Sequence, residues 1–273
     1  MKKTGIFLAL FILGMIVFYA GGYWSGISSF WRTLIKCALP VLLMASACLC
    51  GRYEALRGWR GVLLAFMAAA IGFMVSWFLN DPLLELTGTS ADTIPGIALG
   101  KMFESLLIVV PAYLVARAAG ITNSRMYLKR GKLKAWLVIG IGSFVIFFAL
   151  FLAQIFGSGI ELTVFVSLLP WALLFVFANG FMEEFHFRGL LLQPFEKLLG
   201  KHGANLCIAL FFTLIHAPVQ YTPDIVPFLV ILFGLALAWG YVIQKTEALW
   251  GAALFHAGAD LMIVAGIFET YSG

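Results

Sequence analysis

Charged residues are scarce in this sequence. Asp, Glu, Lys and Arg make up 11% of the 273 residues, whereas an average soluble protein has about 25%. Hydrophobic residues reach 62%, above the roughly 45–50% of soluble domains. A soluble fold could not bury so much apolar surface, and a disordered chain would be poor in these residues. The composition therefore predicts an all-α protein, a polytopic transmembrane helical bundle whose main partner is the lipid bilayer.

Several functional motifs are also missing. The four cysteines show no metal-ligand spacing with a histidine, so we interpret them as small apolar packing residues. No glycine-rich phosphate loop or Walker motif is present, which argues against an ATP-driven machine. The net charge of +5 is typical of a membrane protein, because Lys and Arg collect in cytoplasmic loops. We therefore predict no nucleic-acid partner.

A membrane span needs about 20 mostly apolar residues, and nine stretches are candidates. They are residues 5–22, 34–51, 61–79, 102–118, 135–156, 163–192, 203–220, 225–243 and 248–267. The first could be a cleaved signal peptide, because Lys2 and Lys3 precede it. Phe18 and Ala20 make a poor cleavage site, however, which favours a retained anchor. We expect about eight or nine spans.

The distribution of basic residues predicts the orientation of the spans. With the N-terminus in the cytoplasm, the opposite side receives only three basic residues, Arg32, Lys36 and Lys101. The cytoplasmic loops then receive Lys2, Lys3, Arg52, Arg57, Arg60, Arg117, Arg125, Lys129, Arg130, Lys132, Lys134, Lys197, Lys201 and Lys245. The positive-inside rule therefore predicts a cytoplasmic N-terminus and, with nine spans, an external segment 269–273. We expect a multi-pass protein of a bacterial or archaeal cell membrane.

The most polar stretch, residues 121–134, is the best candidate for a boundary between two groups of spans. It would separate an N-terminal unit, residues 1–130, from a C-terminal unit, residues 131–273. Nothing in the first unit indicates its role.

Ionisable residues inside a span cost free energy and persist where they pair or take part in chemistry. The C-terminal unit contains an unusual set of them: Glu183, Glu184, His186 and Arg188 in one span, His216 in the next, and His256 with Asp260 in the last. Glu184 lies 13 residues before Lys197, His216 lies 15 after Lys201, and His256 lies 11 after Lys245. At about 1.5 Å per residue these depths are roughly 20, 22 and 16 Å. Three helices would thus bring polar groups to one level, which predicts a single intramembrane site.

Helical spacing suggests a role for each residue. Glu184 and Arg188 are four positions apart, the spacing of an ion pair on one helix face. Glu183 then remains unpaired, as a general base requires, and His216 could share its proton. His256 and Asp260 are also four apart, so the carboxylate could orient the imidazole toward an oxyanion.

A purely structural interpretation of these residues is also open. Glu184 and Arg188 could form an ion pair with no part in chemistry. His216 or His256, taken singly, could merely bridge helices by a hydrogen bond. His186 points about 100° per residue away from the acidic neighbours, and we expect it to be non-catalytic.

The same residues resemble three motifs of the CAAX protease and bacteriocin-processing family, the type II CAAX prenyl endopeptidases. The motif E-E-x-x-x-R corresponds to residues 183–188, F-x-x-x-H begins at Phe212 and ends at His216, and H-x-x-x-N/D begins at His256 and ends at Asp260. The order and placement in successive spans fit as well. The resemblance covers residues 160–267.

This resemblance implies a glutamate-dependent intramembrane endopeptidase that acts on a peptide or protein without a cofactor or catalytic metal. It implies that Glu183 and His216 activate water, and that His256 and Asp260 form the oxyanion site. Glu184 and Arg188 would support the helix. Family members with prenylated substrates commonly have Asn at the position of Asp260. An ionised Asp cannot donate a hydrogen bond, so orienting His256 is the expected role of Asp260, and a prenylated substrate is not implied.

Three further expectations concern the site and its alternatives. A cavity reaching the cytoplasmic face would admit water and an extended peptide. A zinc metalloprotease is an alternative, because Glu183 and His186 have the Glu-x-x-His spacing of some metal sites. A proton-coupled transporter or a scaffold is another, in which the same groups relay protons. The oligomeric state is not indicated.

Overall fold

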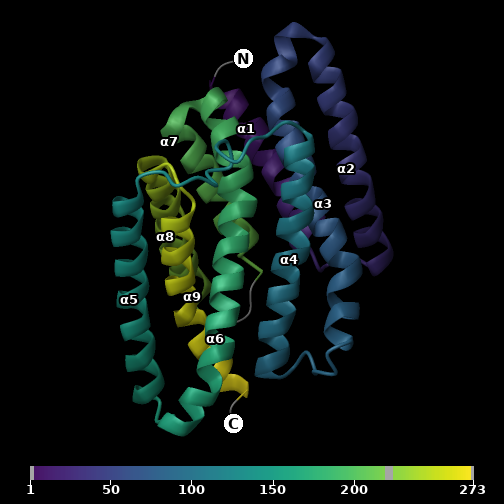
Figure 1. Ribbon diagram of the computed structural model, residues 1–273. Coiled ribbons are helices and arrows are strands. Elements are labelled where there is room, and N and C mark those ends of the chain that lie inside the picture. The colour runs from purple at the N-terminus through teal and green to yellow at the C-terminus, as the bar shows by residue number, and fades with distance from the viewer. Residues whose placement is uncertain (1–2, 219–223, 272–273) are drawn as a thin grey trace.

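The computed structural model describes residues 3–218 and 224–271, and the side chains as far as Gly266. Within these ranges the chain is helical and contains no β-strand, so the predicted all-α class is confirmed (Figure 1). Lys2, positions 219 and 220 of the seventh predicted span, and residues 272–273 lie outside this description.

The helices run along one bundle axis and correspond in order to the predicted spans (Figure 1). A π-helical segment η1 (Met15–Tyr23) extends α1, and a π-helical segment η3 (Glu184–Gly189) joins α6 to α7. The helices are α1 (Lys3–Gly14), α2 (Ser29–Arg52), α3 (Arg57–Glu85), α4 (Ile94–Ala118), α5 (Leu133–Gly157), α6 (Leu162–Glu183), α7 (Leu190–Ile215), α8 (Ile225–Thr246) and α9 (Trp250–Tyr271).

Seven helical stretches in the described residues are long and apolar enough to cross a membrane. One of them, Leu162–Ile215, contains two predicted spans, because Gly200 breaks α7 with a φ of 76°. The rings of Phe187 and Phe212, on either side of Gly200, lie 4.8 Å apart, so the chain turns back at this glycine. The apolar part of α9, Trp250–Gly266, adds a ninth segment. The expected eight or nine spans are therefore confirmed.

The second arm of α7 is shorter than expected. The seventh span was predicted at 203–220, but the helix ends at Ile215. Residues 201–215 extend about 22 Å at about 1.5 Å per residue, which is less than the ~30 Å of a bilayer core. This arm therefore ends within the bundle and leaves His216 at its tip.

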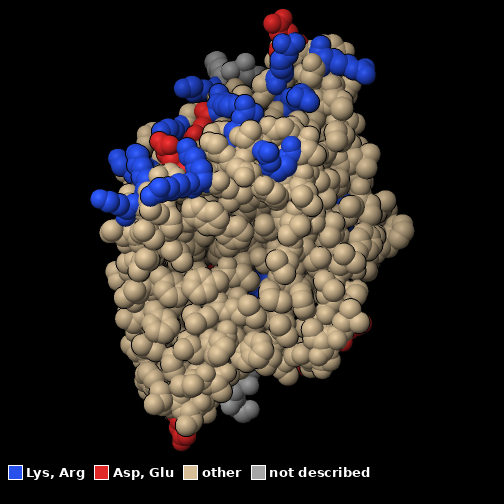
Figure 2. All heavy atoms as spheres, in the orientation of Figure 1, with Lys and Arg blue, Asp and Glu red and all other residues tan. Residues whose placement is uncertain are grey.

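Basic side chains gather at one end of the molecule, the end at which α1 begins and α8 meets α9 (Figures 1 and 2). All three basic residues assigned to the opposite side lie within helices, Arg32 and Lys36 in α2 and Lys101 in α4. Lys36, 5% exposed within α2, donates hydrogen bonds from Nζ to the carbonyl oxygens of Gly21 and Gly22 at 2.7 and 2.8 Å. Lys101, in α4, pairs with Glu104 at 2.6 Å.

The polar stretch 121–134 forms backbone hydrogen bonds with the segment that connects α8 to α9. The backbone N–H of Leu249 donates to the carbonyl of Tyr127 at 3.0 Å, and that of Lys132 donates to the carbonyl of Thr246 at 2.7 Å. These contacts fix the α8–α9 connection and hence the helix that carries His256. The division of the chain near residue 130 stays a prediction.

The N-terminal and C-terminal helices share one hydrophobic core. The ring of Phe18 in η1 stacks on Phe187 in η3, with centroids 4.2 Å apart. Farther along, α6 approaches α9 closely at Gly180, where a Cβ atom would lie 2.8 Å from the backbone nitrogen of Ala257. This contact sets the distance between the helices that carry Glu183 and His256.

Substitution of Gly180 by Ala is expected to push α6 away from α9. Overpacking of this kind costs about 1–3 kcal/mol, so the thermal unfolding temperature in detergent should fall. Gly142→Ala is the matched control, because no atom lies within 4 Å of a Cβ at this position of α5. Equal unfolding temperatures for the two variants would contradict the proposed packing constraint.

Candidate active site

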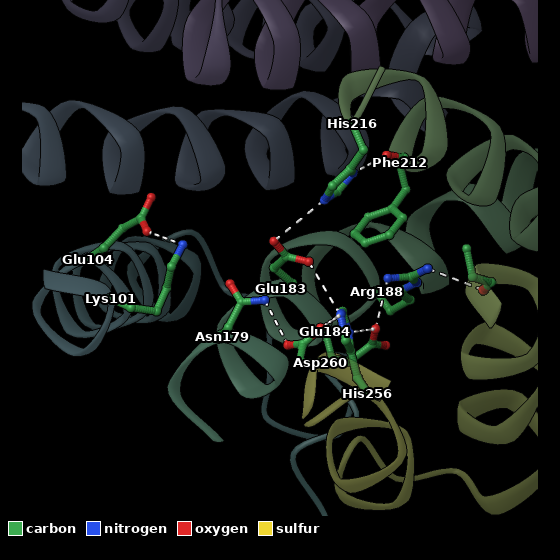
Figure 3. A network of polar contacts seen from close by, with 11 residues as sticks. Lys101, Glu104, Asn179, Glu183, Glu184, Arg188, Phe212, His216, His256 and Asp260 are labelled. Carbon is green, nitrogen blue, oxygen red and sulfur yellow. Dashed lines mark hydrogen bonds and ion pairs between the residues drawn. The ribbon is translucent and has the colours of Figure 1, made fainter. Parts of the chain in front are cut away.

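The first motif lies where α6 passes into the π-helical segment η3. Glu183 is the last residue of α6 and Glu184 the first of η3, and every residue of η3 is buried. π-helical turns occur frequently at functional sites. Figure 3 shows that both carboxylates contact His256, and that Glu183 also points toward His216 and Glu184 toward Arg188.

Glu184 and Arg188 form the predicted ion pair. Nη1 of Arg188 donates to Oε1 of Glu184 at 2.8 Å, and both side chains are 0% exposed. Nη2 of Arg188 donates to the carbonyl of Ala236 in α8 at 3.2 Å. The guanidinium also lies over the ring of Phe212, 4.5 Å from its centroid. The pair therefore ties η3 to α7 and α8.

His256 lies among three carboxylates (Figure 3). Its Nδ1 is 2.9 Å from Oε1 of Glu184, and its Nε2 is 3.5 Å from both Glu183 and Asp260. The ring stacks on Trp239 with centroids 3.7 Å apart and an interplanar angle of 10°. Glu184 thus accepts the hydrogen bond that orients the imidazole. The sequence had predicted Asp260 for this role.

Asp260 has a different hydrogen-bond partner. Its Oδ2 accepts a hydrogen bond from Nδ2 of Asn179 at 2.9 Å. The i, i+4 spacing therefore does bring Asp260 beside His256, but the closer contact joins α9 to α6.

His216, at the tip of α7, turns one nitrogen toward its own helix and the other toward Glu183. Nδ1 donates to the carbonyl oxygen of Phe212 at 2.7 Å, and a carbonyl can only accept. Nε2 therefore carries the lone pair in the neutral ring, and it lies 3.9 Å from Oε1 of Glu183. This distance is too long for a direct hydrogen bond.

A cavity of about 400 Å³ connects these groups. Its lining includes Glu183, His216, His256 and Asp260, with Tyr23, Ser25, Lys101, Phe175, Asn179, Phe212, Ile215, Pro218, Phe228, Leu232 and Ile263. Phe175 and Asn179 precede Glu183 in α6, Lys101 and Phe228 lie near the starts of α4 and α8, and Ile263 follows Asp260 in α9. All these positions lie on the side away from the basic end. The cavity therefore extends away from the basic end. The predicted opening toward the cytoplasm stays a prediction, as does the orientation in the membrane.

Four contributors to the site were not expected from the sequence. Asn179 lies one helical turn before Glu183, and this spacing is a signal that could have indicated it. Lys101 was assigned to a loop, although a nearby Glu104 in an apolar stretch suggested a pair. Tyr23 and Trp239 resemble many other aromatic residues of the chain and carry no sequence signal.

His186 lies away from the cavity lining, as expected for a non-catalytic residue. Its Nε2 bonds the carbonyl oxygen of Ala69 in α3 at 3.0 Å, and its ring packs against Phe18 and Phe73. The Glu183–His186 spacing therefore does not bring both side chains into one site. No group of three or more His, Cys, Asp or Glu side chains arranged for a metal ion is found in the described part of the chain.

Arg188→Met is expected to destabilise the protein strongly, because it leaves Glu184 buried without its counter-charge. Loss of one partner of a buried ion pair costs about 3–5 kcal/mol, which thermal unfolding in detergent can measure. The double variant Glu184→Gln with Arg188→Met removes both charges and should unfold at a higher temperature than Arg188→Met alone. If the single variant is as stable as the wild type, the ion pair does not stabilise the fold.

Comparison with known proteins agrees with the motifs. Residues 165–262 match the family model described as type II CAAX prenyl endopeptidase Rce1-like. No curated protein and no solved structure matches the chain. The matched range contains all three motifs and the cavity residues of α6 to α9 except Ile263, whereas α1 to α5 lie before it. This segment of the chain is similar to the type II CAAX prenyl endopeptidase family.

Proposed function

We propose that the protein is an intramembrane glutamic endopeptidase, in which Glu183 and His216 activate a water molecule for attack on a peptide bond. The observation that supports this most directly is the cavity, where Glu183, His216, His256 and Asp260 from three helices meet. The similarity of residues 165–262 to a family of endopeptidases supports hydrolysis of a peptide bond as the reaction. No cofactor or metal takes part in the proposed reaction.

The distance between Glu183 and His216 suits a bridging water. Oε1 and Nε2 are 3.9 Å apart, and both are acceptors when the acid is ionised and the ring neutral. A water between them can donate one hydrogen to each, which holds its oxygen lone pair toward a substrate. Glu183 acts as the base in this arrangement. The ring of His216, whose Nδ1–H is held by the carbonyl of Phe212, orients the water through Nε2.

The chemical steps then balance with the groups present. Glu183 takes a proton from water as the oxygen attacks the carbonyl carbon, and the C=O electron pair moves to the carbonyl oxygen. The C–N bond breaks as the intermediate collapses, and the amine leaves with the proton from Glu183. The products are a carboxylic acid and an amine, which ionise to a carboxylate and an ammonium.

His256 is suited to stabilise the oxyanion. Glu184 accepts from its Nδ1, and the carboxylates of Glu183 and Asp260 attract positive charge to the ring. An imidazolium would carry a second N–H, on Nε2, that faces the cavity. Asp260 and Asn179 hold this side of the ring, and Glu184 and Arg188 act as positioning residues behind it.

The substrate proposed is an extended peptide segment of a membrane-bound protein. Apart from the proposed catalytic groups, Lys101, Asn179, Tyr23 and Ser25, the cavity lining is apolar. A prenyl group is not required by any contact described. The basic end would face the cytoplasm of a cell membrane.

Glu183→Gln is expected to abolish cleavage, because an amide cannot accept the proton of water. His216→Ala should also reduce cleavage by at least about 10²-fold, as is typical for loss of a general acid–base group. Peptides of membranes from cells with wild-type protein or Glu183→Gln, compared by mass spectrometry, identify a substrate and measure the effect.

Two exposed residues provide matched controls for these variants. Glu161→Gln changes the same residue type at the start of α6, and His202→Ala changes a histidine after Gly200. Both should cleave the identified peptide at the wild-type rate. Wild-type cleavage by Glu183→Gln would exclude the proposed mechanism.

Chelator treatment separates the proposal from the zinc alternative. Protein treated with EDTA and passed over a desalting column should retain its rate, and elemental analysis should find less than one zinc ion per chain. Loss of activity that zinc restores would favour the metalloprotease.

A further inference from the structure

Tyr23 lies at the edge of the catalytic cavity but belongs to an element outside the matched family segment. It is the last residue of η1, and it lines both the catalytic cavity and a neighbouring polar cavity of α2, α3 and α4. Its hydroxyl oxygen is buried and has no hydrogen-bond partner among the described residues. A buried polar group without a partner costs about 1–3 kcal/mol, so its retention at this place requires a reason.

The backbone next to Tyr23 is held by an unusual contact. The ammonium of Lys36, buried in α2, donates to the carbonyls of Gly21 and Gly22 immediately before the tyrosine. The ring of Tyr23 packs edge-on against Phe73 of α3, with centroids 5.2 Å apart. Contacts with two helices therefore fix the position of Tyr23 at the edge of the cavity.

The other polar groups of the cavity are mainly acceptors. Glu183 and Asp260 accept, and so does Nε2 of His216. Asn179 uses one of its N–H groups on Asp260, and Lys101 is engaged by Glu104 at 2.6 Å. The lining has two neutral hydroxyl donors, those of Ser25 and Tyr23. Ser25 is exposed, so the hydroxyl of Tyr23 is the buried one that remains uncommitted.

We propose that Tyr23 is a further catalytic residue, whose hydroxyl donates a hydrogen bond to the carbonyl oxygen of the scissile peptide bond as that oxygen becomes negative. The assignment rests on the proposed hydrolysis. Together with His256 it makes a two-donor oxyanion site, in which Tyr23 supplies the donor that an ionised Asp260 cannot. The proton stays on the phenol throughout, so the balance of the reaction is unchanged.

Lys36 is then a positioning residue, which acts on the reaction through the end of η1. The N-terminal helices acquire a role by the same argument: they place one donor opposite the helices that carry the acid and the imidazoles. This role explains why a lysine is buried in α2.

The test uses the full-length protein in detergent and the peptide identified by comparison with Glu183→Gln. Tyr23→Phe should lower kcat by about 10²-fold, the usual effect of losing one oxyanion donor, and should change KM less than about 3-fold. Tyr19→Phe is the matched control, because Tyr19 lies in the same segment but not in the cavity lining. It should retain the wild-type kcat.

A second measurement does not depend on how much of a variant is folded. The same peptide is made with a thioamide at the scissile bond, since sulfur is a weak hydrogen-bond acceptor. The ratio of oxo to thio rates should fall at least about 10-fold in Tyr23→Phe. Lys36→Met should shift the ratio in the same direction, and Lys36→Arg should restore it in part.

The outcomes separate this inference from the proposed function. An unchanged kcat or an unchanged oxo-to-thio ratio in Tyr23→Phe, with Glu183→Gln inactive, would overturn the role of Tyr23 alone. Wild-type cleavage by Glu183→Gln would overturn both.

Discussion

One oxygen atom connects the stability of the bundle to its chemistry. Oε1 of Glu184 accepts from Arg188 at 2.8 Å and from His256 at 2.9 Å. An uncompensated carboxylate at this depth would be costly, so the guanidinium is needed for the acid to remain charged. The charged acid in turn fixes the ring of His256 through Nδ1. The arrangement of α6, α7, α8 and α9 around the cavity depends on this shared acceptor.

The motif residues could be predicted because few alternatives exist for charges inside a membrane. An ion pair four residues apart on one helix is a local feature, and the structure has Glu184 and Arg188 in contact as expected. The convergence of His216 and His256 on Glu183 followed from counting residues between each side chain and the basic end. Local spacing and depth were sufficient for this part of the site.

Contacts between distant segments account for what the sequence did not reveal. Asp260 was expected to orient His256 because it is the local neighbour, but Glu184, 72 positions away, has the shorter contact. Tyr23 reaches the cavity from a segment more than 150 residues before Glu183, and no spacing rule connects the two. The direction of the cavity also depends on how α4, α8 and α9 pack, and the hydropathy of single helices does not contain this information.

The early end of α7 affects the side of the membrane from which water reaches the cavity. Because this arm stops at His216 and the cavity extends from there toward the starts of α6 and α8, the reacting groups face the half of the bundle opposite the lysine-rich end. With that end in the cytosol, solvent for the reaction would come from the other side of the membrane. The acidity on that side, rather than in the buffered cytosol, would then set how readily a proton can be removed from the attacking water.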